Sequence, residues 1–86
     1  MAQQNADSWK LEYSREAGNY LFDSREYVSA LIDAIVALSQ TQDGIPPEGC
    51  THLEFNHYLW EVAGHLVLYT RLRLDHKLYI TVIKPQ

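Results

Sequence analysis

The sequence predicts an α+β fold of two layers, with two helices packed on a mainly antiparallel, twisted sheet. Three observations support this prediction. Residues 9–13 alternate apolar and polar side chains, which is the two-residue period of a half-buried strand. Apolar side chains recur at helical spacing between Tyr27 and Leu38. The last third of the chain contains three strand-like runs joined by short links. The expected order is strand, helix, helix, strand, strand, strand.

The first half of the chain accounts for one strand and both helices. Ser14 follows the first strand as a helix N-cap and predicts a short helix over residues 14–22. Asp23 and Glu26 form an acidic variant of the capping box, which predicts that the second helix begins there and ends near Gln40. The side chains expected to face the core are Ala17, Tyr20 and Leu21 of the first helix and Tyr27, Val28, Leu31, Ile32, Ile35, Val36 and Leu38 of the second.

The second half begins with a loop and then becomes extended. Residues 41–49 are dense in glycine and proline and predict a loop. Strands are predicted over 57–62, 66–72 and 77–83, with a tight connection at 63–65, so that they form an antiparallel meander. Alternation in the middle strand places Leu66, Leu68, Thr70 and Leu72 on one face and Val67, Tyr69, Arg71 and Arg73 on the other.

Length and composition indicate one globular domain over residues 9–86, preceded by a frayed segment over 1–8. The chain has 86 residues, is 47% hydrophobic and 21% charged, and carries a formal net charge of −4. It has no run of the roughly 18–20 apolar residues that a membrane helix needs and no signal-peptide pattern, so no membrane association is expected. A single cysteine, Cys50, excludes an internal disulfide and fits the cytosol.

The sequence resembles the RelE/ParE toxin superfamily of bacterial toxin–antitoxin systems. The resemblance lies in the element order over residues 9–84 and in two local patterns. One is Trp-x-Leu-x-Tyr-Ser at residues 9–14. The other is Gly64-His65-Leu66-Val67-Leu68-Tyr69, which is similar to the family's Gly-x-x-Arg-apolar-apolar-Tyr stretch on its third strand. The resemblance implies a small α+β fold, a cytosolic bacterial host and a cognate antitoxin.

The family also implies a chemistry. Many members are ribosome-dependent endoribonucleases that make the 2′-hydroxyl of an mRNA attack the adjacent phosphate, whereas others act on gyrase. The cleavage needs a base for the hydroxyl, cations for the phosphate and an acid for the leaving oxygen. Such a site would be expected on a basic surface, because the substrate is RNA on a ribosome.

Several features of this sequence depart from the nuclease pattern. Leu66 stands where the family places its phosphate-binding arginine, and the sequence stops at Gln86 without the tail of catalytic side chains. The expected second strand carries Leu59, Trp60 and Val62 in place of basic residues. The isoelectric point of about 5.4 is also unlike that of toxic members. We therefore expect a protein that lacks the usual nuclease site and acts through an antitoxin-like partner or as a homodimer.

A divergent mRNA endoribonuclease, with the ribosome as partner, is the alternative. Glu48 then follows a loop similar to one in a nuclease subgroup and serves as the base, or His65 does, while Arg71 and Arg73 hold the phosphate. Glu48 can equally be a solvated loop carboxylate. The two arginines, with His76 and Lys77, form either an anion site or an ordinary charged strand edge.

The aromatic side chains are candidates for contacts with other molecules. Trp60, Tyr69 and Tyr79 are the expected interface residues. Tyr69 and Tyr79 could instead stack on RNA bases or pack across strands. The four histidines are His52, His57, His65 and His76, and their spacing matches no metal-ligand motif, so no metal or other cofactor is expected.

Overall fold

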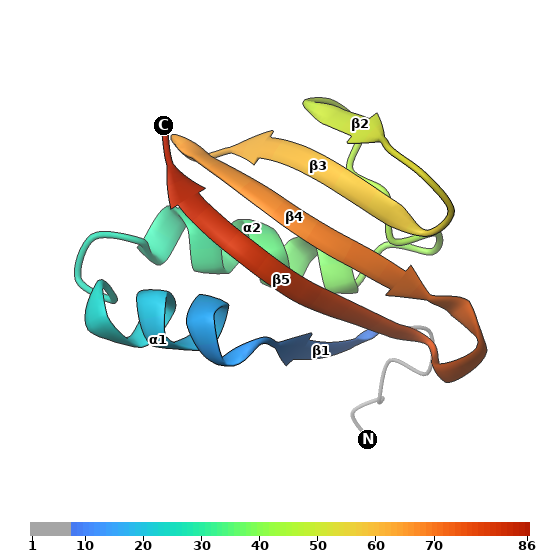
Figure 1. Ribbon diagram of the computed structural model, residues 1–86, viewed down its shortest axis with the longest axis horizontal. Coiled ribbons are helices and arrows are strands. Elements are labelled where there is room, and N and C mark those ends of the chain that lie inside the picture. The colour runs from blue at the N-terminus through green and yellow to red at the C-terminus, as the bar shows by residue number, and fades with distance from the viewer. Residues whose placement is uncertain (1–7) are drawn as a thin grey trace, which may run out of the picture.

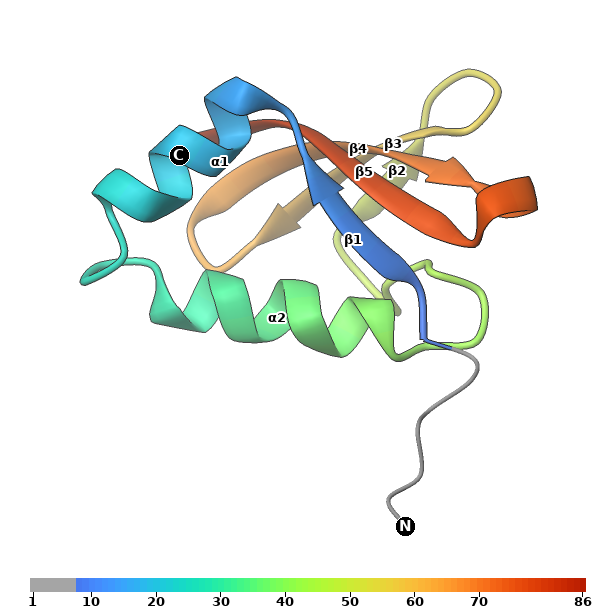
Figure 2. The ribbon, with the colours of Figure 1, turned by 90° about the horizontal axis from the view of Figure 1, so that it is seen from below.

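The computed structural model describes residues 8–86, which form a two-layer α+β structure with a five-stranded sheet and both helices on one of its faces (Figures 1 and 2). The prediction of a frayed segment over residues 1–8 lies, except for Ser8, outside the described residues. In chain order the elements are β1 (Lys10–Tyr13), α1 (Arg15–Asp23), α2 (Ser29–Ser39), β2 (Cys50–His52), β3 (His57–Val62), β4 (His65–Leu72), a 3-10 turn (Arg73–Asp75) and β5 (Lys77–Pro85).

The strands lie in the order β1-β5-β4-β3-β2. Strands β3, β4 and β5 form the predicted antiparallel meander, and β2 adds an antiparallel edge strand. Strand β1 joins the other edge parallel to β5, with Lys10 opposite Lys77 and Tyr13 opposite Ile80. The α+β class and the mainly antiparallel sheet are therefore confirmed, while the parallel pair is a feature that the alternation pattern alone does not predict.

The junction of β1 and α1 is anchored on β5. Ser14 is the N-cap that the sequence predicts, and its Oγ accepts a hydrogen bond from the Ala17 N–H at 3.0 Å. The same hydroxyl donates to the Thr81 carbonyl at 2.7 Å. Thr81 is the extra residue of a β-bulge, because Leu68 pairs with Val82 while Tyr69 pairs with Ile80. One serine side chain thus fixes both the start of the helix and its position on the sheet.

The predicted start of the second helix is wrong. Helix α1 runs on through Asp23, and α2 begins only at Ser29, after a turn in which the Tyr27 N–H donates to the Ser24 carbonyl at 2.7 Å. Val28 precedes α2 and is 2% exposed, whereas Tyr27 is 84% exposed. Burial of Val28 decides the register of α2, and the apparent capping box is instead part of the end of α1 and the turn.

Other differences are smaller. Strand β2 is absent from the prediction because three residues are too few to display an alternation. Strand β4 begins at His65, and β5 continues to Pro85. Val36, expected in the core, is 42% exposed on the outward side of α2.

The core lies between the helices and the inner face of the sheet, which is the face that the helices cover. Tyr69 at its centre is fully buried, and its hydroxyl donates to the Gly44 carbonyl at 2.9 Å, which ties the loop over residues 41–49 to the sheet. The core residues are Trp9, Ala17, Leu21, Val28, Leu31, Ile35, Leu38, Tyr58, Trp60, Val67, Tyr69, Leu78, Ile80 and Ile83.

Candidate functional site

The four side chains that the sequence proposes for catalysis do not meet in one place. His65 begins β4 and Arg71 lies six residues further along the same strand, so about 20 Å separates them at roughly 3.3 Å per residue. Arg73 is exposed in the 3-10 turn beyond Arg71. Glu48 is exposed in the loop before β2 and lines a hollow to which Ala63 of the β3–β4 turn also contributes. A shared active site of these four residues is therefore not formed.

His65 is held as a structural residue. It is 9% exposed, and its Nδ1 lies 2.8 Å from the Ala63 carbonyl while its Nε2 lies 2.7 Å from the Tyr20 hydroxyl. A carbonyl oxygen can only accept, so Nδ1 carries a proton, and in the neutral form of the ring this leaves Nε2 to accept from the Tyr20 hydroxyl. The lone pair that a general base would use is thereby occupied, and the contact links β4 to α1.

Glu48 stands beside a tight contact between the loop and β3. Gly49 adopts φ +77°, and its carbonyl accepts a hydrogen bond from the Glu61 N–H at 2.7 Å. A Cβ on Gly49 would lie 2.6 Å from the Glu61 carbonyl oxygen, so only glycine fits here. The proline and glycine residues around Glu48 allow the chain to make this close contact as it passes from the loop into β2. Within the described residues, the Glu48 carboxylate forms no ion pair.

Arg71 is surrounded by aromatic rings. Its guanidinium carbon lies 5.5 Å from the centre of the Trp9 ring and 5.6 Å from that of the Tyr58 ring. Its Nη1 donates to the Tyr58 hydroxyl at 3.1 Å, while its Nε is buried without a hydrogen-bond partner. Within residues 8–86 the ion pair that forms is Lys77 with Glu12, at 3.1 Å, so no described carboxylate neutralises Arg71.

The rings around Arg71 extend into a stacked series. His76 stacks on Trp9 with ring centres 4.1 Å apart, and His52 stacks on Tyr58 at 4.5 Å. His76 follows the 3-10 turn and Trp9 precedes β1, while Arg71, Tyr58 and His52 lie on β4, β3 and β2. Cation–π contacts of this kind contribute up to about 2 kcal/mol when the cation is desolvated. Arg71 thus packs against aromatic side chains at one end of the core. The sequence does not reveal this role, because the residues that contact Arg71 are far apart along the chain.

The half-buried Cys50 thiol lies near the buried Tyr69 hydroxyl. Burial is the main cause that raises the pKa of the Tyr69 hydroxyl far above its ordinary value, and the neighbouring Cys50 thiol adds to the shift. Burial also raises the pKa of the Cys50 thiol, and the neighbouring Tyr69 hydroxyl offsets part of this shift. Both groups are therefore protonated at neutral pH, and Cys50 lacks the thiolate that a nucleophile requires.

The three predicted interface residues divide between the two faces. Trp60 and Tyr69 are 5% and 0% exposed, so they belong to the core of this chain, and Trp60 also lines part of two hollows beside the loop over residues 41–49. Their inner-face position reflects the alternation in β3 and β4, which sequence alone does not orient. Tyr79 is half-buried on the opposite face, which remains accessible.

That opposite face, which no helix covers, is here called the outer face (Figure 2). Three rows of side chains cross it. Each row runs from β5 through β4 to β3, and the rows are Lys84–Leu66–Glu61, Val82–Leu68–Leu59 and Tyr79–Thr70–His57. Six of these nine side chains are half-buried, whereas Lys84, Glu61 and His57 are exposed. The outer face therefore has an apolar middle, one row of charge and one polar row.

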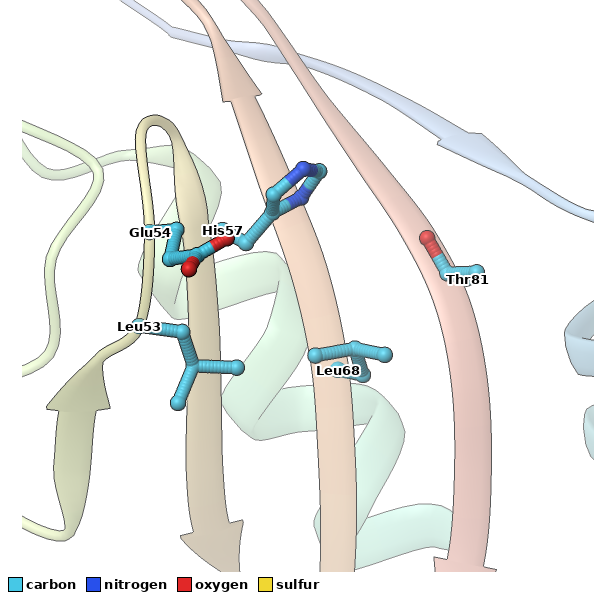
Figure 3. Close-up of a pocket in the computed structure, with 5 residues that line it drawn as sticks. All are labelled: Leu53, Glu54, His57, Leu68 and Thr81. Carbon is cyan, nitrogen blue, oxygen red and sulfur yellow. The ribbon is translucent and has the colours of Figure 1, made fainter.

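Two adjoining hollows shape the outer face. The first is lined by Leu59, Leu66, Leu68, Val82 and Lys84. The second is lined by Leu53, Glu54, His57, Leu68 and Thr81, and Figure 3 shows the Leu53 side chain extending from the β2–β3 loop towards Leu68 on β4. Leu68 is common to both, so the two hollows adjoin at this residue. The alternation in the sequence places Leu66 and Leu68 on one face but does not identify that face as the uncovered one.

Two further features concern the described residues alone. No helix among residues 8–86 is both long and apolar enough to cross a bilayer. The same residues contain no group of three or more His, Cys, Asp and Glu side chains that could hold a metal ion.

Comparison with known proteins assigns no family to this chain. No family model matches the sequence, and no curated protein matches it either.

Proposed function

We propose that this chain is a RelE/ParE-like protein of toxin–antitoxin type that lacks the usual nuclease site and acts through contact with another protein. The observation that carries the proposal is the surroundings of Leu66, the position at which the resemblance implies a phosphate-binding arginine. Leu66 lies in a hollow formed with Leu59, Leu68 and Val82, and Lys84 is the one cation among the lining residues. Apolar walls of this kind favour a protein surface over an RNA phosphate.

The arrangement of the elements supports the fold part of the proposal. The chain runs β-α-α-β-β-β with one additional three-residue strand, β2, before the meander. This is the order that the resemblance implies, and it places Leu66 near the start of the middle strand of the meander.

The chemistry of the candidate catalytic groups supports the absence of nuclease activity. Cleavage requires a base, a cation and an acid around one phosphate. Here about 20 Å of strand separates His65 from Arg71, and the Nε2 lone pair of His65 is occupied by Tyr20. The net charge of −4 adds a long-range repulsion from RNA.

Expression in a bacterial host tests this proposal. We expect growth to continue at the rate of the empty-vector control after induction, and cellular mRNA to stay intact at positions occupied by ribosomes. Purified chain added to a translation reaction should likewise leave the message uncut. Growth arrest accompanied by ribosome-dependent cleavage would overturn the proposal.

The divergent endoribonuclease remains the second candidate because Arg71 lacks a neutralising carboxylate and Arg73 lies exposed two residues away. Under this reading, expression arrests growth and Arg73→Ala relieves the arrest. The Arg73 side chain is exposed, so its replacement should leave the fold intact. Arg15→Ala, which removes an exposed arginine on α1, is the matched control and should not relieve the arrest.

A further inference from the structure

We infer that the outer face is a homodimer interface, in which two copies pack sheet against sheet about a two-fold axis that runs along β4. The inference names the partner in the proposed function as a second copy of this chain and rests on that function for its biological meaning. The first observation is the apolar middle of the face. Leu59, Leu66, Leu68 and Val82 line one hollow on this face, which no helix covers. Contiguous apolar surfaces of this kind mark interaction sites.

The order of the side chains within each row identifies the partner. A two-fold axis along β4 leaves β4 opposite β4 and brings β5 of one copy over β3 of the other. In the charged row, Lys84 then faces the partner's Glu61, and Glu61 faces the partner's Lys84. In the apolar row, Val82 faces the partner's Leu59 while Leu68 meets its own counterpart. A two-fold interface must be self-complementary, and these rows satisfy that condition.

The geometry of sheet packing fits the same axis. Two sheets that pack face to face keep their strands roughly aligned and about 10 Å apart, with apolar side chains interdigitating between them. An axis along β4 keeps the two central strands aligned. The half-buried leucines of β4, at two-residue spacing, supply the layer of side chains that such a packing requires.

The loop between β2 and β3 extends the interface. Figure 2 shows this loop curling away from the helices, on the outer side of the sheet. It carries Leu53 and Phe55, which are 47% and 84% exposed. Because the loop lies beyond β3, the axis brings it over the partner's β5, where Tyr79 and Thr81 are half-buried. An otherwise unexplained pair of exposed apolar side chains thereby gains a contact surface.

Charge reversal tests the axis directly. Lys84→Glu places a carboxylate opposite the partner's Glu61, and Glu61→Lys places an ammonium group opposite the partner's Lys84. Each variant alone should raise the dimer Kd by at least about tenfold, because every dimer then contains two like-charged contacts. A mixture of the two variants restores opposite charges across the interface of the mixed dimer. We expect mixed dimers to form preferentially in native mass spectrometry, with one isotopically labelled variant.

Sedimentation equilibrium gives the oligomeric state. The wild-type chain should show twice the 10.0 kDa mass of one chain at micromolar concentrations. Leu68→Lys, at the centre of the face, should sediment as a monomer. Val36→Lys is the matched control, because Val36 is an exposed apolar residue on the opposite side of the molecule, and it should remain dimeric. Asp33→Lys and Arg15→Glu, which reverse exposed charges on the helices, should also leave the dimer intact.

Two results would overturn the inference. One is a wild-type chain that sediments as a monomer at all micromolar concentrations tested. The other is a mixture of the two charge-reversal variants that forms no more mixed dimer than either forms alone, which would exclude the axis along β4. Circular dichroism of each variant verifies that it is folded. The proposed function fails separately, through growth arrest and mRNA cleavage, and a monomeric chain that causes neither would leave that function standing with a different partner.

Discussion

Tyr20 and His65 show how a single polar contact holds two elements together. The hydroxyl and the imidazole Nε2 are 2.7 Å apart, and the rings meet edge to face with centres 5.6 Å apart. His65 is 9% exposed, so water cannot easily replace the hydroxyl once it is removed. The contact is the main polar link between the last turns of α1 and the start of β4.

Tyr20→Phe should lower the free energy of unfolding by about 1–2 kcal/mol, because it leaves a buried acceptor without its donor. Urea denaturation measures the change. Tyr27→Phe is the control, since Tyr27 is 84% exposed, and it should change stability by less than about 0.5 kcal/mol. Equal effects of the two substitutions would mean that the Tyr20–His65 contact does not contribute to stability.

Tyr69 makes stability depend on alkaline pH. Burial raises its pKa above the ordinary value of about 10. Above about pH 10 the unfolded chain loses the phenolic proton while the folded chain keeps it, so the free energy of unfolding falls by about 1.4 kcal/mol per pH unit for this group. Tyr13, whose pKa burial also raises, adds a fall in the same direction.

Unfolding in urea between about pH 9 and pH 11 measures this dependence. Tyr69→Phe should be less stable at neutral pH, because it loses the hydrogen bond to Gly44, but its stability should fall less steeply with rising pH. An unchanged slope would mean that Tyr69 ionises in the folded chain.

For single side chains, the sequence indicates which groups could carry chemistry but not what surrounds them. The partners of Arg71 are Trp9 and Tyr58, which lie 62 and 13 positions away along the chain. Neither pairing leaves a local pattern. The inward orientation of Trp60 and Tyr69 was equally hidden, because an alternating strand has two faces and only the position of the helices distinguishes them.

The arrangement of the strands includes close approaches between backbone segments, and the clearest is at the start of β2, where Gly49 contacts Glu61 of β3. Gly49 and Gly64 share almost the same backbone conformation, with φ +77° and +75°. They differ in surroundings, since a Cβ at Gly49 would lie 2.6 Å from the Glu61 carbonyl oxygen and one at Gly64 meets nothing within 4 Å.

Gly64→Ala should therefore cost about 1–2 kcal/mol, which is the strain of a left-handed conformation alone. Gly49→Ala should cost clearly more, because the backbone must also move away from Glu61. The difference between the two free energies of unfolding isolates the clash. A difference near zero would show that the loop before β2 shifts without penalty.

Sequence predicted the long elements well and the short ones poorly. The N-cap at Ser14, the end of α2 and the three strands of the meander follow from strong local patterns, and the structure confirms them. Strand β2 and the start of α2 do not follow from such patterns. Each is decided by contacts with distant residues, through the pairing of Cys50 with Trp60 and through the burial of Val28.

At the scale of the molecule, the two faces of one sheet have different roles. Val67 and Leu66 are neighbours on β4, yet Val67 is fully buried against the helices and Leu66 lines the outer face. Val67→Ala should lower the free energy of unfolding by about 2 kcal/mol, because it opens a cavity in the core.

Leu66→Ala removes more atoms but should cost less, when measured at a concentration low enough for the chain to be monomeric. Urea denaturation of both variants gives the order. The reverse order would mean that another part of the chain covers Leu66.

The sequence pattern supplied the two-layer architecture and the split of β4 into two faces, whereas the pairing of β1 with β5 required the structure.

That pairing governs when the protein can fold during its synthesis. Strand β1 leaves the ribosomal exit tunnel before its hydrogen-bonding partner β5, and both helices and strands β2, β3 and β4 lie between them in the sequence. Contacts between such distant segments slow folding. The backbone groups of β1 stay without their strand partner until β5 has been translated, and it is during this interval that a chaperone would bind the segment.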